Sequence, residues 1–232
     1  MKNKKRYFFK PYEGKFYQKG LLNGKKVMVL GASFYCKEEK CKFYEACTSP
    51  YPRRTEEFDK SCLAEYHISE RPQFEVSEDG ARSYNRFYTF MARYLEERGV
   101  VGISDFETFW EHVTFTNYIQ YMIGGRTRTS SNDLSDDDLI AFCDAIDEFE
   151  PDIVIIWGCV INKPIKYKDS DEDDPDFNND FDESEHRHDL FHWQFHGRKI
   201  TFINCYHPSA GIFFGKDEEE KMKKCLDEAF GE

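Results

Sequence analysis

The sequence has no apolar run that approaches the roughly 18–20 residues needed to span a bilayer. Its first residues, MKNKKRYFFKPYEGK, contain neither the apolar core nor the small-residue cleavage site of a secretory signal. Neither of the Gly-rich phosphate-binding motifs is present, and the chain has no internal repeat. We therefore expect a cytoplasmic, monomeric protein that has no membrane partner and requires no nucleotide or redox cofactor.

Core-forming side chains, in contrast, are abundant, since 40% of the 232 residues are hydrophobic and 17% are aromatic. A chain of this length supports one large domain with a substantial core, or at most two small ones. We expect a basic and aromatic N-terminal arm over residues 1–24 and a single α/β domain over residues 25–232. An acidic insertion interrupts this domain at about residues 168–188.

The formal net charge of −12 is spread unevenly along the chain. Residues 168–188 hold ten acids and two bases, whereas residues 1–26 hold nine lysines and arginines and one acid. This distribution favours a directed electrostatic face, and it also fits a solubilising tail and a solvated loop. The aromatics among the N-terminal bases are typical of an arm that stacks on nucleic acid, and equally of a segment that packs under a sheet.

Four short runs predict the strands of a largely parallel sheet. The run at Val27–Leu30 is unbroken and apolar, as in a strand that is buried on both faces. The runs at Ile153–Ile156 and Ile200–Ile203 repeat its form, and the run at Val113–Thr116 is β-prone. Apolar spacing and capping residues predict helices over residues 82–97, 106–112, 135–149 and 217–230. The alternation of strands and helices predicts an α/β fold.

Small, polar and aromatic residues follow these strands. Ligands of open α/β sheets bind in the crevice beyond the carboxyl ends of the strands. His207, held by Pro208, can present a ring nitrogen there, and the amide of Asn117 suits the edge of a nucleobase. A structural histidine and a turn asparagine are the alternatives. The residues expected around the crevice are Ala32, Ser33, Phe34, Tyr35, Asn117, His207 and Ser209.

Taken in order, these stretches resemble the uracil-DNA glycosylase superfamily over roughly residues 25–230. LGASFYC stands where that family has its first motif, which is Gly-x-Asp-Pro-Tyr-His in one branch and Gly-Glu-x-Pro-Gly in another. FTNYIQ resembles the strand with the uracil-reading asparagine, PDIVIIWG the middle strand, and CYHPSA the second motif, usually His-Pro-Ser. The resemblance implies a three-layer α/β/α sandwich around a short, mostly parallel sheet.

The resemblance also implies an enzyme that hydrolyses the N-glycosidic bond of uracil, or of a related damaged base, after flipping it out of DNA. By position, Phe34 or Tyr35 is the wall on which the base stacks, and Asn117 reads the base. His207 stabilises the departing anion, with Ser209 as a further hydrogen-bond donor.

The first motif departs from the family at one important position. The family's water-activating acid falls on Ser33 in one alignment and on Ala32 in the other, and neither side chain is a general base near pH 7. Some branches place a neutral residue in this slot and still cleave, because the glycosidic bond breaks largely before water attacks. We therefore expect Ser33 to position a water without accepting its proton.

After His-Pro-Ser, the family carries an apolar wedge that fills the gap left by the flipped base. An Ile-Phe-Phe run occupies that place here, and burial in the core is its alternative interpretation. We expect this run and four basic loop residues to contact DNA. The residues concerned are Arg53, Arg54, Arg126, Arg128, Ile212, Phe213 and Phe214.

Four cysteines, Cys36, Cys41, Cys47 and Cys62, lie within one loop-rich stretch. Thiols this close in sequence can bind zinc or an iron–sulfur cluster, or they can be buried or incidental. One branch of the superfamily holds a four-iron cluster, but with a tight C-x-x-C that is absent here. Four histidines also lie close together in sequence. They could form a second metal site, or they could belong to a polar loop that leads into a strand: His186, His188, His192 and His196.

These observations predict a DNA base-excision glycosylase whose partner is DNA with a damaged base, in single or double strands. Two alternatives stay open. The same fold could recognise a base or nucleotide without cleaving it, which the neutral Ser33 favours. The stretch from Cys36 to Cys62 could instead form a metal-stabilised protein-interaction domain.

Overall fold

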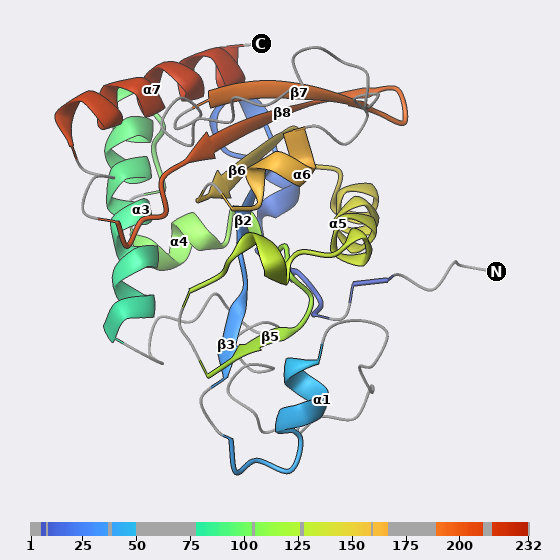
Figure 1. Cartoon of the computed structure of the whole chain (residues 1–232). Coiled ribbons are helices and arrows are strands. Elements are labelled where there is room, and N and C mark those ends of the chain that lie inside the picture. The colour runs from blue at the N-terminus through green and yellow to red at the C-terminus, as the bar shows by residue number, and fades with distance from the viewer. Residues whose placement is uncertain are drawn as a thin grey trace.

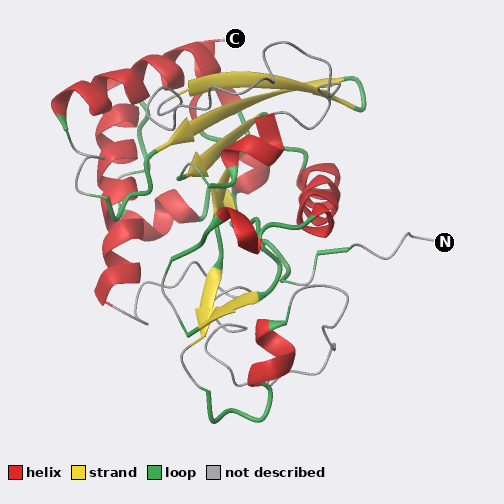
Figure 2. Cartoon of the chain, in the orientation of Figure 1, coloured by secondary structure: helices red, strands yellow, loops and turns green. Residues whose placement is uncertain are grey.

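The computed structural model describes residues 6–7, 9–36, 39–49, 78–103, 105–125, 128–158, 160–166, 189–210 and 215–231. Figure 2 shows its helices and strands by type. The strands are β1 (Tyr12–Glu13), β2 (Val27–Gly31), β3 (Phe34–Cys36), β4 (Val113–Asn117), β5 (Met122–Gly124), β6 (Ile153–Trp157), β7 (Asp189–Phe195) and β8 (Arg198–Cys205). The α-helices are α1 (Tyr44–Thr48), α3 (Glu78–Glu97), α4 (Phe106–Trp110), α5 (Asp136–Phe149), α6 (Asn162–Lys166) and α7 (Lys216–Gly231). In the part of the chain so described, no helix is long and apolar enough to cross a membrane.

A six-stranded sheet with the order β1-β4-β2-β6-β8-β7 forms the centre of the fold (Figure 1). Its four inner strands, β4, β2, β6 and β8, run parallel, and the edge strands β1 and β7 run antiparallel to their neighbours. The predicted α/β fold with a mostly parallel central sheet is therefore confirmed. The register aligns Asn117 with Gly31 and Trp157 with Cys205, so the carboxyl ends of the parallel strands meet at one edge.

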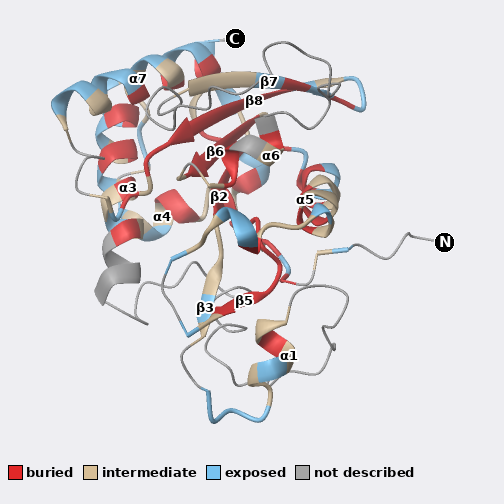
Figure 3. Cartoon of the chain, in the orientation of Figure 1, coloured by how far each residue is buried: buried red, intermediate tan, exposed pale blue. Residues whose placement is uncertain are grey.

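Alternation along the strands explains why both faces of this sheet are apolar. In β2, Val27 and Val29 belong to one buried cluster, while Met28 and Leu30 belong to another on the opposite face. Figure 3 shows the central strands as the most continuously buried part of the chain. An unbroken apolar run is therefore what a parallel strand of this sheet requires.

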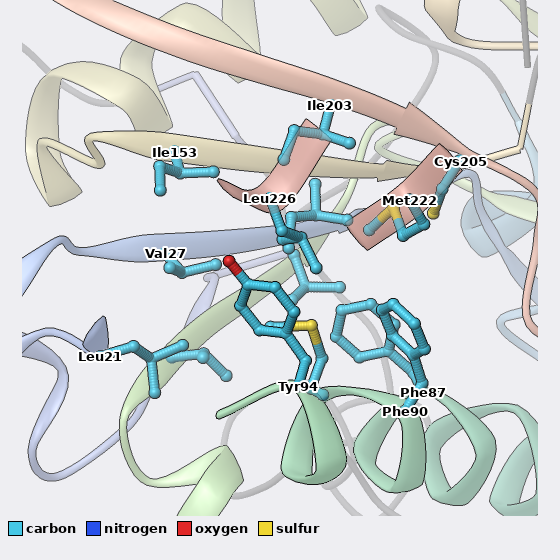
Figure 4. Close-up of a cluster of buried hydrophobic side chains, with 14 of the residues drawn as sticks. Leu21, Val27, Phe87, Phe90, Tyr94, Ile153, Ile203, Cys205, Met222 and Leu226 are labelled. Carbon is cyan, nitrogen blue, oxygen red and sulfur yellow. The ribbon is translucent and has the colours of Figure 1, made fainter. Parts of the chain in front are cut away.

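Helices α3, α4 and α7 supply side chains to the first cluster, and Figure 4 shows several of these side chains directed at the strands. Phe87 and Tyr94 of α3 are fully buried, and Met222 and Leu226 of α7 join them. Full burial of one such side chain contributes about 1.5–3 kcal/mol to stability. Helix α3 begins at Glu78, four residues before the start predicted from the apolar spacing, and it ends at Glu97 as predicted.

Helices α5 and α6 pack on the other face, through residues such as Phe142, Ile146 and Ile165. The predicted cap of α5 is confirmed, because Ser135 and Asp138 form a reciprocal capping box. The carboxylate of Asp138 also accepts a hydrogen bond from the backbone N–H of Gln120 at 3.0 Å. This contact ties the start of α5 to the segment that follows β4.

A second, two-stranded parallel sheet pairs β3 with β5. The sequence did not predict it, and it lies beyond the end of β2, next to α1 (Figure 1). Its side chains Phe34, Cys36 and Met122 pack with Phe9 and Cys47 in a small third cluster. The first motif is thus held by strand pairing as well as by side-chain packing.

The described aromatics of the N-terminal arm pack against the domain. Tyr7 donates a hydrogen bond from its hydroxyl to Glu148 of α5 at 2.5 Å. Phe9 is buried and meets Phe34 edge-to-face, with ring centroids 5.1 Å apart, and Tyr17 is fully buried. These three side chains therefore fit the interpretation in which the arm packs against the domain, and not the one in which its aromatics stack on nucleic acid.

Candidate functional site

Asn117 lies at the carboxyl end of β4, directly beside Gly31 of β2. A Cβ atom at residue 31 would be only 2.1 Å from Oδ1 of Asn117, so the absence of a side chain at Gly31 makes room for this amide. The backbone of Asn117 is fixed separately, because its carbonyl accepts a hydrogen bond from Nε2 of Gln120 at 2.7 Å. Among the described residues, the side-chain amide of Asn117 makes no hydrogen bond, so its donor and its acceptor can both serve a ligand.

His207 follows β8 by two residues and its ring is held in one orientation. The backbone N–H of Ser209 donates to Nδ1 of His207 at 3.2 Å, so Nδ1 carries a lone pair and no proton. The Ser209 hydroxyl oxygen lies 2.7 Å from the same nitrogen and therefore donates to it as well. In the neutral ring the proton must then be on Nε2, which becomes a hydrogen-bond donor.

The charge state of His207 supports that assignment. Burial lowers the pKa of His207 from its usual 6.5 to about 4, because the surrounding protein disfavours the charged imidazolium. At neutral pH the ring is therefore uncharged and presents a single N–H. Ser209, expected to contact the substrate, uses both its hydroxyl and its backbone N–H to orient this ring.

Trp157, at the end of β6, lies beside His207 and Phe115. Its ring is 5.8 Å from that of His207 and 5.7 Å from that of Phe115. By strand alternation Asn117 is on the same face as Phe115, and Phe115 shares the first buried cluster with Trp157. Asn117 and His207 therefore lie on one face at one edge of the sheet, although they are far apart in sequence.

Gly158 allows the chain to leave β6 beside His207. Its φ of +95° suits a glycine, and its N–H donates to the carbonyl of Cys205 at 2.8 Å. A Cβ atom at residue 158 would come within 3.8 Å of Cβ of His207. The strand end and the histidine are therefore packed closely together.

Three hydroxyl groups converge near the first motif. The Oγ of Ser33 lies 2.5 Å from Oγ1 of Thr129, and the Oη of Tyr35 lies 3.0 Å from the same Thr129 oxygen. The motif itself is attached to the segment after β4, because the N–H of Ile119 donates to the carbonyl of Ala32 at 2.9 Å. Thr129 was not predicted as a site residue. The only sequence signal was its place in a hydroxyl-rich loop.

The structure distinguishes the two aromatics proposed as a stacking wall. Phe34 and Tyr35 are consecutive in β3, so their side chains lie on opposite sides of the strand. The ring of Phe34 packs against Phe9 in the third cluster. Tyr35 is 38% exposed and its hydroxyl lies next to that of Thr129, so of the two rings only that of Tyr35 is open to a ligand.

Arg86 of α3 is a second residue that the sequence did not single out. Its Nη1 donates to the carbonyl of Pro208 at 3.3 Å, which fixes the turn between His207 and Ser209. Arg128, predicted to contact DNA, is exposed and precedes Thr129. The other predicted DNA-contacting residues lie outside the described residues, namely Arg53, Arg54, Arg126, Ile212, Phe213 and Phe214.

The cysteine site remains a prediction. Cys47 is buried, Cys36 is half-buried and Cys41 is exposed, while Cys62 lies outside the described residues. Within the described part of the chain, no three or more histidine, cysteine, aspartate or glutamate side chains are grouped so that they could hold a metal ion. Elemental analysis of the purified protein would test for zinc or iron.

The histidines considered as a second metal site lie in and around the β7–β8 hairpin. His192 is in β7, and its Nδ1 lies 3.3 Å from Oγ1 of Thr201. His196 is at the hairpin turn with a φ of +48°. His186 and His188 lie outside the described residues.

Comparison of the sequence with models of known protein families and with curated proteins gives no match. The chemistry of the site therefore has to be argued from its own residues. An uncharged N–H donor and an amide that makes no hydrogen bond within the described residues lie at the carboxyl edge of a parallel sheet, and an exposed aromatic belongs to the small sheet beyond β2. These are groups that recognise a planar polar ligand with an edge and a face.

Proposed function

We propose that the protein is a uracil-DNA glycosylase-like enzyme that hydrolyses the N-glycosidic bond of uracil or a related damaged base in DNA. The observation that carries the proposal is the placement of Asn117 and neutral His207 on one face at one edge of the sheet. The two residues come from different strands and match the positions of the base-reading asparagine and the anion-stabilising histidine in the resembled family.

The chemistry follows from these two groups. The amide of Asn117 can donate and accept simultaneously, as the edge of uracil requires. When the glycosidic bond breaks, negative charge develops on the departing base, and the Nε2–H of His207 donates to it. A neutral donor is suitable because it strengthens its hydrogen bond as charge develops, and loss of one such donor costs about 10²–10³-fold in rate.

The same proposal covers the architecture and the partner. Helices on both faces of the sheet support a three-layer α/β/α sandwich. DNA would approach the edge that bears the crevice, where the exposed Arg128 lies next to Thr129. We propose a cytoplasmic monomer that acts on single- or double-stranded DNA and uses no cofactor in bond cleavage.

A non-catalytic module that binds a base or nucleotide is the second candidate. It is favoured by Ser33, a neutral residue in the slot where the resembled family places its acid. Under this candidate Asn117, Tyr35 and His207 would hold the base in the same way, without turnover.

Incubation with oligonucleotides carrying a panel of damaged bases, scored by alkali cleavage at abasic sites, separates the two candidates. Excision by the wild type, with strong loss in His207→Ala and Asn117→Ala, supports the enzyme. His196→Asn is a matched control, because it removes a histidine at the β7–β8 turn, at the opposite end of β8. Binding without any abasic product would favour the binding module.

A further inference from the structure

A glycosylase without an acid in its first motif must still dispose of a proton. Attack by water on the sugar carbon leaves an oxygen that has to lose one hydrogen, and a carboxylate would normally accept it. Ser33 occupies that slot and cannot hold the proton as a base near pH 7. The structure therefore has to provide a path by which the proton leaves.

The three hydroxyls beyond β2 provide such a path in space. Oγ of Ser33, Oγ1 of Thr129 and Oη of Tyr35 follow one another at 2.5 and 3.0 Å, both within hydrogen-bonding distance. Ser33 and Thr129 are half-buried, whereas Tyr35 is 38% exposed. The chain of hydroxyls therefore runs from two half-buried residues to one that is exposed to solvent.

Thr129 is the middle of this chain. It precedes a capped turn in which the N–H and the hydroxyl of Ser130 both donate to the carboxylate of Asp133, at 2.7 and 3.0 Å. The carbonyl of Asp133 in turn accepts a hydrogen bond from the hydroxyl of Tyr121. The backbone is therefore held by hydrogen bonds directly after Thr129.

A hydroxyl has one hydrogen, so Thr129 can donate to only one of its neighbours and must accept from the other. If Ser33 donates to Thr129 and Thr129 donates to Tyr35, the lone pairs of Ser33 are left to accept from a water. In the opposite direction Ser33 would present its own hydrogen instead. Both arrangements are consistent with the two distances. When each hydroxyl passes its proton to the next one, the first arrangement becomes the second.

We propose that Ser33, Thr129 and Tyr35 form a relay that carries the proton of the attacking water to solvent. The proposal rests on the glycosylase function above. The bond between the sugar carbon and the base nitrogen breaks, and the electron pair leaves with the base, which His207 stabilises as an anion. The water oxygen then bonds to the sugar carbon. Its proton moves to Ser33 as Ser33 passes one to Thr129, Thr129 to Tyr35, and Tyr35 to solvent.

The test uses single-turnover excision of the preferred base from the panel, measured in H₂O and in D₂O. Thr129→Val removes the middle hydroxyl while keeping the branched shape, and Thr129→Ser is the matched control that keeps the hydroxyl. Because the departed base can rejoin the sugar cation until water has been captured, net excision depends on proton loss from that water. We therefore expect Thr129→Val to excise about tenfold more slowly, below the 10²–10⁴-fold typical of a full general base. It should also show a smaller solvent isotope effect, and Thr129→Ser should resemble the wild type.

A carboxylate in the slot makes the relay unnecessary, which provides the decisive comparison. Ser33→Asp should excise at least as fast as the wild type, and adding Thr129→Val to it should change its rate little. A merely structural Thr129 would predict the same loss in both backgrounds, and that outcome overturns the relay. Equal rates and isotope effects for Thr129→Val and the wild type overturn it too. A wild type and a Ser33→Asp variant that excise no base overturn the glycosylase proposal, and the relay with it.

Discussion

Gly31→Ala tests directly whether the position of the Asn117 amide matters. The added Cβ would lie 2.1 Å from Oδ1 and 3.3 Å from Cγ of Asn117. Since non-bonded atoms rest at about 3.5 Å, the amide oxygen has to move by roughly 1–1.5 Å. A misplacement of about 1 Å in a group that positions substrate costs about 10²-fold in rate. We therefore expect Gly31→Ala to lower single-turnover excision about 10²-fold, with an overpacking cost of about 1–3 kcal/mol in unfolding free energy.

A double-mutant cycle with Asn117→Ala identifies the cause of that loss. If Gly31→Ala acts by displacing the amide, it should add little to the defect of Asn117→Ala, so the two effects should be strongly non-additive. Urea unfolding of all variants reports whether enough folded protein is present. Fully additive losses in rate, or a Gly31→Ala variant as fast as the wild type, would refute the reasoning.

Three further predictions concern the histidine, its turn and the fold. Because the pKa of His207 is lowered to about 4, its ring should stay neutral, with the proton on Nε2, down to about pH 5. Its contribution to stability, complete above pH 6.5, should be lost as pH falls toward 4. Nitrogen chemical shifts measured by NMR would check this, and titration near pH 6.5 would contradict it. Arg86→Ala, which frees the carbonyl of Pro208, should slow excision about tenfold, as loss of a charged donor worth about 1.5 kcal/mol implies, with Arg86→Lys intermediate. Asp138→Ala should lower the unfolding free energy in urea by about 3 kcal/mol, whereas exposed Asp136→Ala should change it by less than about 0.5 kcal/mol.

The sequence predicted the inner strands because burial on both faces leaves an unbroken apolar run, as in Val27–Leu30 and Ile153–Ile156. It also predicted that Asn117 and His207 follow parallel strands, whose carboxyl ends must meet at one edge. It did not predict β1, which has two residues, or the pairing of β3 with β5, whose three residues each carry no periodic signal. Such short strands are defined by their partners.

Contacts between distant segments could not be predicted from the sequence either. Thr129 is 96 residues from Ser33, and Arg86 is 122 residues from Pro208, so no local pattern could link them. The choice between Phe34 and Tyr35 likewise required knowing that they alternate across a strand. Side-chain chemistry could be predicted from residue type, whereas the partner of each side chain depended on the fold.

The most direct test of the nucleobase crevice is an NMR titration of isotope-labelled protein with DNA. The oligonucleotide carries one 2′-fluoro-2′-deoxyuridine, in which the electron-withdrawing fluorine slows bond cleavage. A matched strand with an abasic analogue at the same position serves as the control. We predict that the side-chain amide of Asn117 and Nε2 of His207 shift together, saturably, with the uracil strand only. Signals that stay unchanged, or that shift equally with the abasic strand, would contradict the assignment of these two residues to one base-binding site.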